Sequence, residues 1–450
     1  MMKTFWQGSG RLCRLAVPIV AAQLAYALLS FIDIVSLGLI SPTALAGGAL
    51  ASAILAFFYL VSSMMVSVVG NEVAYARGAG DEAGITAAVQ AGIVLSSIMG
   101  VVGTTIVWSS PFWLGFFGQE PSIVDAAREY LRGAAAGLFF GLFFACHRSV
   151  LASLGRPTAI TVVIAAVGII KIIVNTWIVR SVADFGEPLL WGLRLVGLSA
   201  VGGYILLSAA LWFYGRYVFP QHMAFRKLAW ARWDQMKKTL RLGMPIGVAT
   251  ALEVGLFTSS TLVVGRLGEV ALAAHQLALQ CIFMSFTLVL GLSQAVAIEV
   301  GLAAGGWHGR AARRAAHQGL AIGFIFMSVM IVVFALYGTD MAGLLIRDEG
   351  AQASAVILLA GQLILIAACF QWVDGIQVIA LGALRGLKIT KPAMVATLVG
   401  YWAIGFPSMI GLSLLFGAYG VWWGLVLGLT VAAVMLVVRF EQAVRQLPQT

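Results

Sequence analysis

Charged residues are scarce in this chain. Only 10% of its 450 residues are Asp, Glu, Lys or Arg, whereas 61% are hydrophobic. About a quarter of a typical soluble globular domain is charged, so this chain has too few charges to cover the surface of a water-soluble body of its size. The shortage excludes an ordinary soluble protein and indicates a chain that places most of its surface in lipid.

Cysteine, histidine and catalytic motifs are also sparse. Neither the four cysteines nor the five histidines show the spacing of a metal site, and the cysteines show no disulfide pattern. No phosphate-binding loop and no GxSxG or HExxH motif is present. The sequence therefore predicts neither an enzyme nor an ATP-driven machine, and it predicts no cofactor. We interpret the cysteines as small apolar packing residues: Cys13, Cys146, Cys281 and Cys369.

Long apolar runs recur from one end of the chain to the other. Runs of about twenty residues have the length needed to cross a bilayer, and in lipid such runs must be helices because backbone groups must bond internally. The first run is too long for a signal peptide and no small-residue cleavage site follows it, so we expect a retained helix. The pattern predicts an all-α membrane protein with twelve transmembrane helices. The predicted spans are 12–38, 44–70, 85–108, 123–147, 158–180, 189–215, 241–265, 271–301, 314–337, 353–382, 392–416 and 420–438.

The net charge of +10 is distributed unevenly over this topology. With twelve spans, seven segments including both termini lie on one side of the membrane. Together with the adjoining ends of the spans, these segments hold 21 of the 28 Lys and Arg residues. An excess of Lys and Arg marks the cytoplasmic side. We therefore predict a multi-pass protein of the cell inner membrane with both termini in the cytoplasm. The basicity indicates orientation and contact with anionic membrane lipids, not binding of nucleic acid.

The chain repeats itself at an offset of 227 residues. Pro18 matches Pro245, residues 44–46 (ALA) match 271–273, and the register holds without a gap over about eighty residues. Such self-similarity indicates two copies of one structural unit. Six spans separate equivalent positions, and because six is even both copies should have the same orientation in the membrane.

We expect the two copies to form six-helix lobes, residues 1–215 and 241–450, joined by a basic cytoplasmic linker at 216–240. The lobes should be related by a pseudo-two-fold axis along the membrane normal. A cavity between two similar lobes can open to either side by rocking. This architecture favours a transporter over a scaffold, a channel or a membrane enzyme.

Three carboxylates inside predicted spans are candidate site residues, because a charge at mid-membrane costs about 2.5–3.5 kcal/mol even on the mildest scale. We interpret Asp33 in the first span as a cation or proton site; the alternative is a structural hydrogen-bond hub. Glu253 and Asp374 lie near the middle of the seventh and tenth spans. At similar depth in one lobe they can share a proton, coordinate Na⁺ through their oxygens or attract an organic cation. The alternative is that they never meet and each caps a broken helix.

Lys171 and Asn175 lie four residues apart in the fifth span and so share one helix face. Asn175 is close in depth to Asp33. Lys171 lies a turn deeper, with a side chain long enough to reach Asp33 or to extend toward the interface. A contact between Lys171 and Asp33 would lower the energetic cost of both charges; the alternative is that Lys171 meets only water in a cavity.

The remaining charges near span ends are interpreted as structural. Glu72 and Glu299 are equivalent in the repeat, and we expect them to anchor loops at the ends of the second and eighth spans. Five basic residues are interpreted as charges at cytoplasmic ends of spans: Arg148, Arg156, Arg385, Lys388 and Lys391.

Several motifs, taken in order, resemble those of the MATE (multidrug and toxic compound extrusion) family, especially its NorM-type branch. They occur in both predicted lobes, and the resemblance covers nearly the whole chain. The motifs are residues 15–19 (LAVPI) with Gln23, Asp33 and Gly38; residues 241–246 (RLGMPI) with Glu253 and residues 256–257 (LF); and residues 371–377 (QWVDGIQ) with residues 382–386 (GALRG).

The resemblance implies a drug/sodium or drug/proton antiporter. In the family, the acid that matches Asp33 serves a first-lobe cation site, and the acids that match Glu253 and Asp374 serve a second-lobe site. Asn175 matches a family asparagine near the first-lobe acid. The position one turn earlier is usually polar and uncharged in the family but is Lys171 here, so we predict that the first lobe does not bind sodium.

We therefore predict a multidrug efflux antiporter that exports organic cations or amphipathic compounds in exchange for inward H⁺ or Na⁺ and acts as a monomer. One alternative is a lipid-linked saccharide flippase of a related superfamily, which would need a strongly basic cavity. The other is a membrane-embedded enzyme, which would need a nucleophile or metal constellation. Mid-membrane charges identified in the sequence are acidic except Lys171, which disfavours the flippase.

Overall fold

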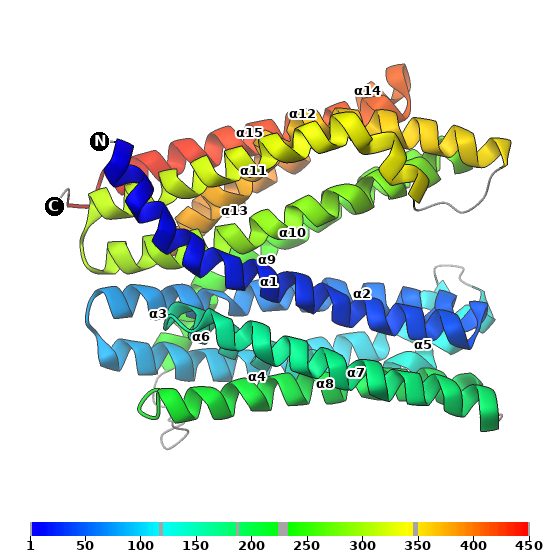
Figure 1. The fold of residues 1–450 in the computed structure, drawn as a ribbon, viewed down its shortest axis with the longest axis horizontal. Coiled ribbons are helices and arrows are strands. Elements are labelled where there is room, and N and C mark those ends of the chain that lie inside the picture. The colour runs from blue at the N-terminus through cyan, green and yellow to red at the C-terminus, as the bar shows by residue number, and fades with distance from the viewer. Residues whose placement is uncertain (1, 117–119, 186–188, 224–232, 345–349, 449–450) are drawn as a thin grey trace. The chain divides into compact units, whose positions relative to one another are not determined.

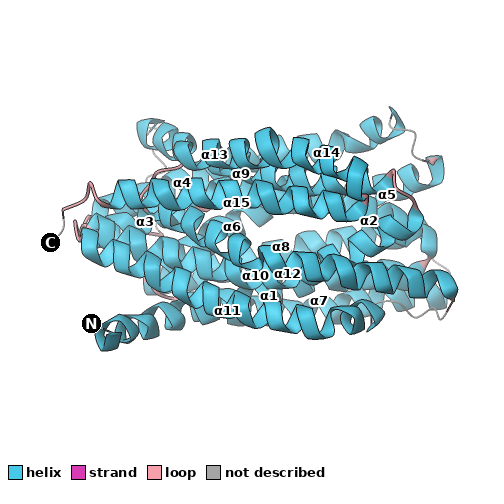
Figure 2. Cartoon of the chain, turned by 90° about the horizontal axis from the view of Figure 1, so that it is seen from above, coloured by secondary structure: helices cyan, strands magenta, loops and turns pink. Residues whose placement is uncertain are grey.

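A computed structural model describes residues 2–116, 120–185, 189–223, 233–344 and 350–448, and helices account for nearly all of them (Figure 1). The predicted all-α fold is confirmed (Figure 2). The helices are α1 (Met2–Ile40), α2 (Pro42–Val66), α3 (Val68–Gly78), α4 (Glu82–Phe116), α5 (Pro121–Ala134), α6 (Gly137–Ser153), α7 (Pro157–Phe185), α8 (Leu189–Val218), α9 (Trp233–Gly265), α10 (Glu269–Gly305), α11 (Gly309–Leu344), α12 (Ala351–Gly386), α13 (Lys391–Thr397), the π-helix η3 (Leu398–Gly405), α14 (Phe406–Phe416) and α15 (Ala418–Val444).

The number of spans agrees with the sequence. Among the described residues, eleven helical segments are long and apolar enough to cross a membrane, and the bent pair α5 and α6 makes twelve. The two helices of this pair meet at an angle of 49°. Each predicted span therefore corresponds to one helix or to consecutive helices of the structure.

Three predicted spans are interrupted, and two of the interruptions have a local cause. Between α2 and α3 the hydroxyl of Ser67 donates to the carbonyl of Met64 at 2.7 Å, a side-chain bond that competes with the helical ladder. The eleventh span contains η3 just before Pro407. Proline has no backbone N–H, so it removes a bond to the preceding turn and favours irregular helix geometry.

The helices form two compact units. One unit contains Met1–Val20 and Val248–Thr450, and the other contains Ala21–Gly247. Each boundary falls within a long helix, α1 or α9, two residues after the repeat-equivalent prolines Pro18 and Pro245. The predicted lobe boundaries at 215 and 241 stay a prediction. Three charges of the predicted linker lie outside the described residues: Arg226, Lys227 and Arg232.

The repeat-equivalent acids Glu72 and Glu299 each contact the beginning of one of the divided helices. Within unit 21–247, Thr239 at the beginning of α9 donates its hydroxyl to Glu72 at 2.7 Å. Within the other unit, Arg11 near the beginning of α1 pairs with Glu299 at 3.1 Å. Both contacts are with helices, whereas the sequence predicted that these acids anchor loops.

Helices α5 and α8 approach closely because glycines face each other where they cross. A Cβ on Gly197 would lie 2.5 Å from the carbonyl oxygen of Tyr130, and one on Gly133 would lie 2.3 Å from that of Arg194. Real Cβ atoms do not approach a backbone so closely, so a larger residue at either position must push the helices apart.

We expect Gly197→Ala to destabilise this unit by about 1–3 kcal/mol, the usual cost of overpacking. Gly202→Ala on the same helix is the matched control, because a Cβ there meets nothing within 4 Å. The control should be neutral or slightly stabilising, since alanine is the better helix former. Thermal unfolding in detergent measures both, and equal melting temperatures for the two variants would contradict the close-packing argument.

Candidate functional site

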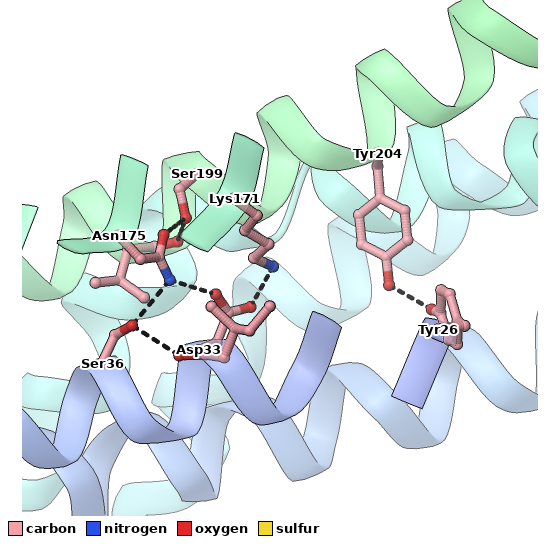
Figure 3. Close-up of polar contacts among 9 residues, drawn as sticks. Tyr26, Asp33, Ser36, Lys171, Asn175, Ser199 and Tyr204 are labelled. Carbon is pink, nitrogen blue, oxygen red and sulfur yellow. Dashed lines mark hydrogen bonds and ion pairs between the residues drawn. The ribbon is translucent and has the colours of Figure 1, made fainter. Parts of the chain in front are cut away.

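Asp33 and Lys171 form a buried ion pair in unit 21–247 (Figure 3). Lys171 Nζ on α7 lies 2.6 Å from Asp33 Oδ2 on α1, and the two side chains are only 7% and 8% exposed. The sequence left open whether Lys171 reaches Asp33 or points into water. The structure places the two groups in direct contact.

The second carboxylate oxygen of Asp33 is also occupied. Asn175 Nδ2 donates to Asp33 Oδ1 at 3.0 Å and also contacts Ser36 Oγ at 3.0 Å. Ser199 Oγ on α8 donates to Asn175 Oδ1 at 2.6 Å, which fixes the orientation of the amide (Figure 3). Each oxygen of Asp33 thus has a partner, and three helices hold the network together.

The positive and negative charges of this network cancel. The ammonium of Lys171 stabilises the ionised carboxylate of Asp33 and neutralises it, so the pair needs no further cation. A bound sodium ion would need several free oxygens, whereas both oxygens of Asp33 already accept bonds. A proton can still be exchanged between the carboxylate, the ammonium and water.

The other unit holds Glu253 on α9 and Asp374 on α12. Asp374 is 3% exposed, and the two carboxylates interact electrostatically. Neither one makes a hydrogen bond or ion pair with another residue in the part of the chain that the structure describes, and Glu253 Oε1 is buried. Two acids so placed repel each other strongly when both are ionised. A proton or a cation is therefore required to balance them.

Arg385 belongs to the same group, which corrects its interpretation as a loop charge. It lies in the last turn of α12, is only 7% exposed and interacts electrostatically with Glu253. Arg148 was also interpreted as a loop charge, but it lies within α6, where it donates to Gln23 at 2.8 Å. With Glu253, Asp374 and Arg385 all ionised the group carries one net negative charge, which one monovalent cation can balance.

Two buried polar residues near these acids were missed by the sequence analysis. Gln377 and Tyr401 are each 0% exposed, and Tyr401 on η3 interacts electrostatically with both Glu253 and Asp374. The Gln377 amide and the Tyr401 hydroxyl lie close together, yet neither forms a hydrogen bond of good geometry with a described residue. Their oxygens, together with the carboxylates, are the groups that can hold a hard monovalent cation or ordered water here.

The aromatic residues next to the acids pack elsewhere. Phe370 is fully buried and stacks on Trp422 with ring centroids 6.0 Å apart. Trp372 is 42% exposed, stacks on Phe324 and donates its indole N–H to Ser328. Both have packing roles, so neither supports a cation-binding pocket beside Asp374.

Comparison with known proteins gives the family. The model of the MatE family matches residues 18–177 and 245–410. The chain is 36% identical over 441 residues to the probable multidrug resistance protein NorM of Pseudomonas putida, covering 97% of this chain and 95% of the relative. It is 34% identical over 440 residues to the multidrug resistance protein NorM of Burkholderia vietnamiensis, covering 95% of this chain and 92% of the relative.

The fold is similar to that of solved MATE transporters. A crystal structure of a mutant of the Vibrio cholerae MATE transporter VcmN matches with a TM-score of 0.87 at 15% identity and covers 99% of each chain. A eukaryotic MATE transporter matches with a TM-score of 0.85 at 18% identity, covering 98% of each chain. The sequence matches and the helical architecture agree, and they confirm both the resemblance and the expectation that the chain is not an enzyme: it belongs to the MATE family of multidrug transporters.

Proposed function

We propose that this protein exports amphipathic or cationic organic compounds from the cytoplasm in exchange for inward-moving protons. The observation that carries the choice of ion is the closed Asp33 site, where Lys171 Nζ lies 2.6 Å from the carboxylate in the place a metal cation would need. A covalently attached ammonium cannot leave, so sodium has no free position there. A proton can still be exchanged with the carboxylate.

Protonation of Asp33 changes the charge of the first site from neutral to positive. The neutral carboxyl no longer balances Lys171, and the free ammonium then disfavours a cationic substrate nearby. Release of the proton restores the ion pair and removes the repulsion. Antiport requires such a difference in substrate affinity between two states.

Glu253 and Asp374 supply the second coupling site in this proposal. Arg385 balances one of the two negative charges, so the group takes up one further positive charge. A proton bound there competes with a cationic substrate for the same negative charge. No cofactor beyond the coupling ion is required, and in this proposal the positive charge taken up at the second site is also a proton.

We place the protein as a monomer in the inner membrane with both termini in the cytoplasm. The distribution of basic residues supports this orientation: 21 of the 28 Lys and Arg residues lie on one predicted side. Such an excess is typical of the cytoplasmic side of a membrane protein. The same basic loops would contact the anionic lipids of that leaflet.

Efflux from proteoliposomes tests the coupling ion. With the purified chain and a fluorescent organic cation inside the vesicles, an imposed proton gradient without sodium should drive efflux, and a sodium gradient at constant pH on both sides should not. A potassium gradient of the same size controls for ionic strength and membrane potential. Efflux driven by sodium alone would reject the proton proposal.

A further inference from the structure

Three tyrosine side chains from separate helices meet in unit 21–247. The hydroxyls of Tyr26 on α1 and Tyr204 on α8 are 2.6 Å apart (Figure 3). The ring of Tyr59 on α2 stacks on Tyr26 with centroids 5.7 Å apart and lies 5.6 Å from the ring of Tyr204. Tyr59 is 8% exposed, and its buried hydroxyl has no hydrogen bond of good geometry within the described ranges.

This tyrosine cluster (Tyr26, Tyr59 and Tyr204) lies beside the Asp33–Lys171 pair. Tyr26 precedes Asp33 by seven residues on α1, which is two helical turns on one face, or about 10 Å. Lys171 extends from α7 toward the side of Asp33 on which the tyrosines lie (Figure 3). Tyr204 also interacts electrostatically with Asp33. Tyr204 is therefore the member of the cluster that links it to the ion pair.

The cluster continues toward the N-terminal end of α1. Arg148 donates to Gln23, one turn before Tyr26, at 2.8 Å, and its guanidinium lies 5.7 Å from the centroid of the Phe144 ring. Arg148 also interacts electrostatically with Tyr59. A guanidinium does not give up its proton in proteins. Arg148 therefore lies at the end of the row of hydroxyls and cannot itself pass on a proton.

The hydroxyls need an explanation beyond packing. A buried phenol without a partner costs about 1–3 kcal/mol, and phenylalanine would fill the same space. Gly141 on α6 makes room for two of the rings, since a Cβ there would lie 2.9 Å from Tyr59 and 3.2 Å from Tyr204. The unit thus holds three hydroxyls in one place, and the Tyr59 hydroxyl is kept there at an energetic cost, because it is the one without a well-formed hydrogen bond.

We propose that Tyr26, Tyr204 and Tyr59 relay protons between the Asp33–Lys171 pair and the N-terminal end of α1. Lys171, or Asp33 when protonated, gives a proton through bridging water to one hydroxyl. Each hydroxyl accepts a proton on its oxygen and passes its own proton to the next group. A water molecule near Gln23 accepts the last proton as hydronium, so no electrons are exchanged and no bond other than O–H or N–H changes.

Other polar groups around the cluster fit this role. Tyr130 on α5 interacts electrostatically with Asp33, and Arg148 on α6 holds a positive charge at the far end. The positive charge disfavours any cation that stays at that end, hydronium included, so a proton delivered there passes on to the water beyond, and the relay through fixed hydroxyls moves only protons. The relay rests on the proton coupling proposed above and would deliver protons from Asp33 to the predicted cytoplasmic side.

The test uses Tyr26→Phe, Tyr204→Phe and Tyr59→Phe in the full chain in proteoliposomes. Proton uptake measured with an internal pH dye on addition of the organic cation should be about tenfold slower in each, since proton-transfer groups contribute at least this much to rate. Substrate affinity should stay within about twofold, because no bond to the substrate is lost. Tyr217→Phe on α8 is the matched control, as this tyrosine is 87% exposed, and it should match the wild type.

Tyr59→Phe guards against a purely structural effect, because the hydroxyl that it removes makes no well-formed hydrogen bond and its loss should not lower the melting temperature. Slower proton uptake at unchanged stability supports the relay. Wild-type rates in all three variants overturn the relay and leave proton coupling intact. A wild-type protein that takes up no protons during exchange overturns the coupling proposal itself, and the relay with it.

Discussion

Replacement of either acid in the second unit is expected to abolish proton-coupled efflux. Glu253→Gln and Asp374→Asn keep the size of the side chain but remove the charge and the site of protonation. Because the two acids and Arg385 together carry one net negative charge, loss of one acid leaves the group neutral without a bound cation. The coupling ion then has no charge to balance, and we expect gradient-driven efflux to fall by about 100-fold or more.

Efflux of a fluorescent organic cation from proteoliposomes under an imposed proton gradient measures this effect. Asp340→Asn and Glu269→Gln are matched controls, since both acids lie in the same unit and are exposed at helix ends. Both controls should transport at the wild-type rate. If Glu253→Gln and Asp374→Asn also transport at that rate while folding normally, the assignment of these two acids as coupling residues is wrong.

The sequence predicted the acids of this group better than their surroundings. A carboxylate in the middle of an apolar run is visible without a structure, because its energetic cost demands a role. Arg385 lies at the end of such a run, where a loop charge and a buried charge look alike in sequence. Gln377 and Tyr401 carry no charge, and only the packing of η3 against α15, which itself packs against α12, brings Tyr401 to the acids. Gln377 lies three residues after Asp374, and that helical spacing was a usable signal.

At the Asp33 site, too, the sequence predicted some partners and missed others. Helical spacing placed Lys171 and Asn175 on one face, and similar depth placed Asn175 near Asp33. Ser36, three residues after Asp33, was predictable from spacing in the same way. Ser199 was not, because its bond to Asn175 depends on how α7 and α8 rotate against each other. Contacts along one helix follow from the sequence, whereas contacts between helices need the packing.

The fold was predictable to the level of spans. Apolar length and the 227-residue repeat are enough to locate the helices that, among the described residues, are long and apolar enough to cross a membrane. The interruptions in the second and fourth spans were not predicted. The repeat gave no signal for them, since the equivalent helices α10 and α12 are continuous. The division of α1 and α9 between the two units was also not predicted. The division of the helices depends on tertiary packing, and the break after α2 depends on a side-chain hydrogen bond of Ser67; a hydropathy pattern contains neither.

The largest expected effect on stability is at Lys171. Lys171→Asn removes the partner of a carboxylate that is 8% exposed, and loss of one member of a buried ion pair typically costs about 3–5 kcal/mol. The asparagine also adds a carbonyl oxygen on the same face of α7 and leaves the position of the ammonium beside Asp33 open to a cation. We therefore expect Lys171→Asn to be strongly destabilised and to gain a sodium site, so that sodium raises its melting temperature and the wild type shows no response.

Thermal unfolding in detergent with sodium, potassium or choline chloride at equal ionic strength measures both effects. Sodium at about 100 times its dissociation constant would restore about 2.7 kcal/mol to Lys171→Asn. Lys171→Met is the matched control, because it removes the same charge without adding an oxygen, so it should be destabilised and respond less to sodium. The double change Asp33→Asn with Lys171→Met removes both charges and should recover much of the lost stability. Sodium stabilisation of the wild type that disappears on Asp33→Asn would show that the first site binds sodium despite Lys171, and the closed-site argument would then fail.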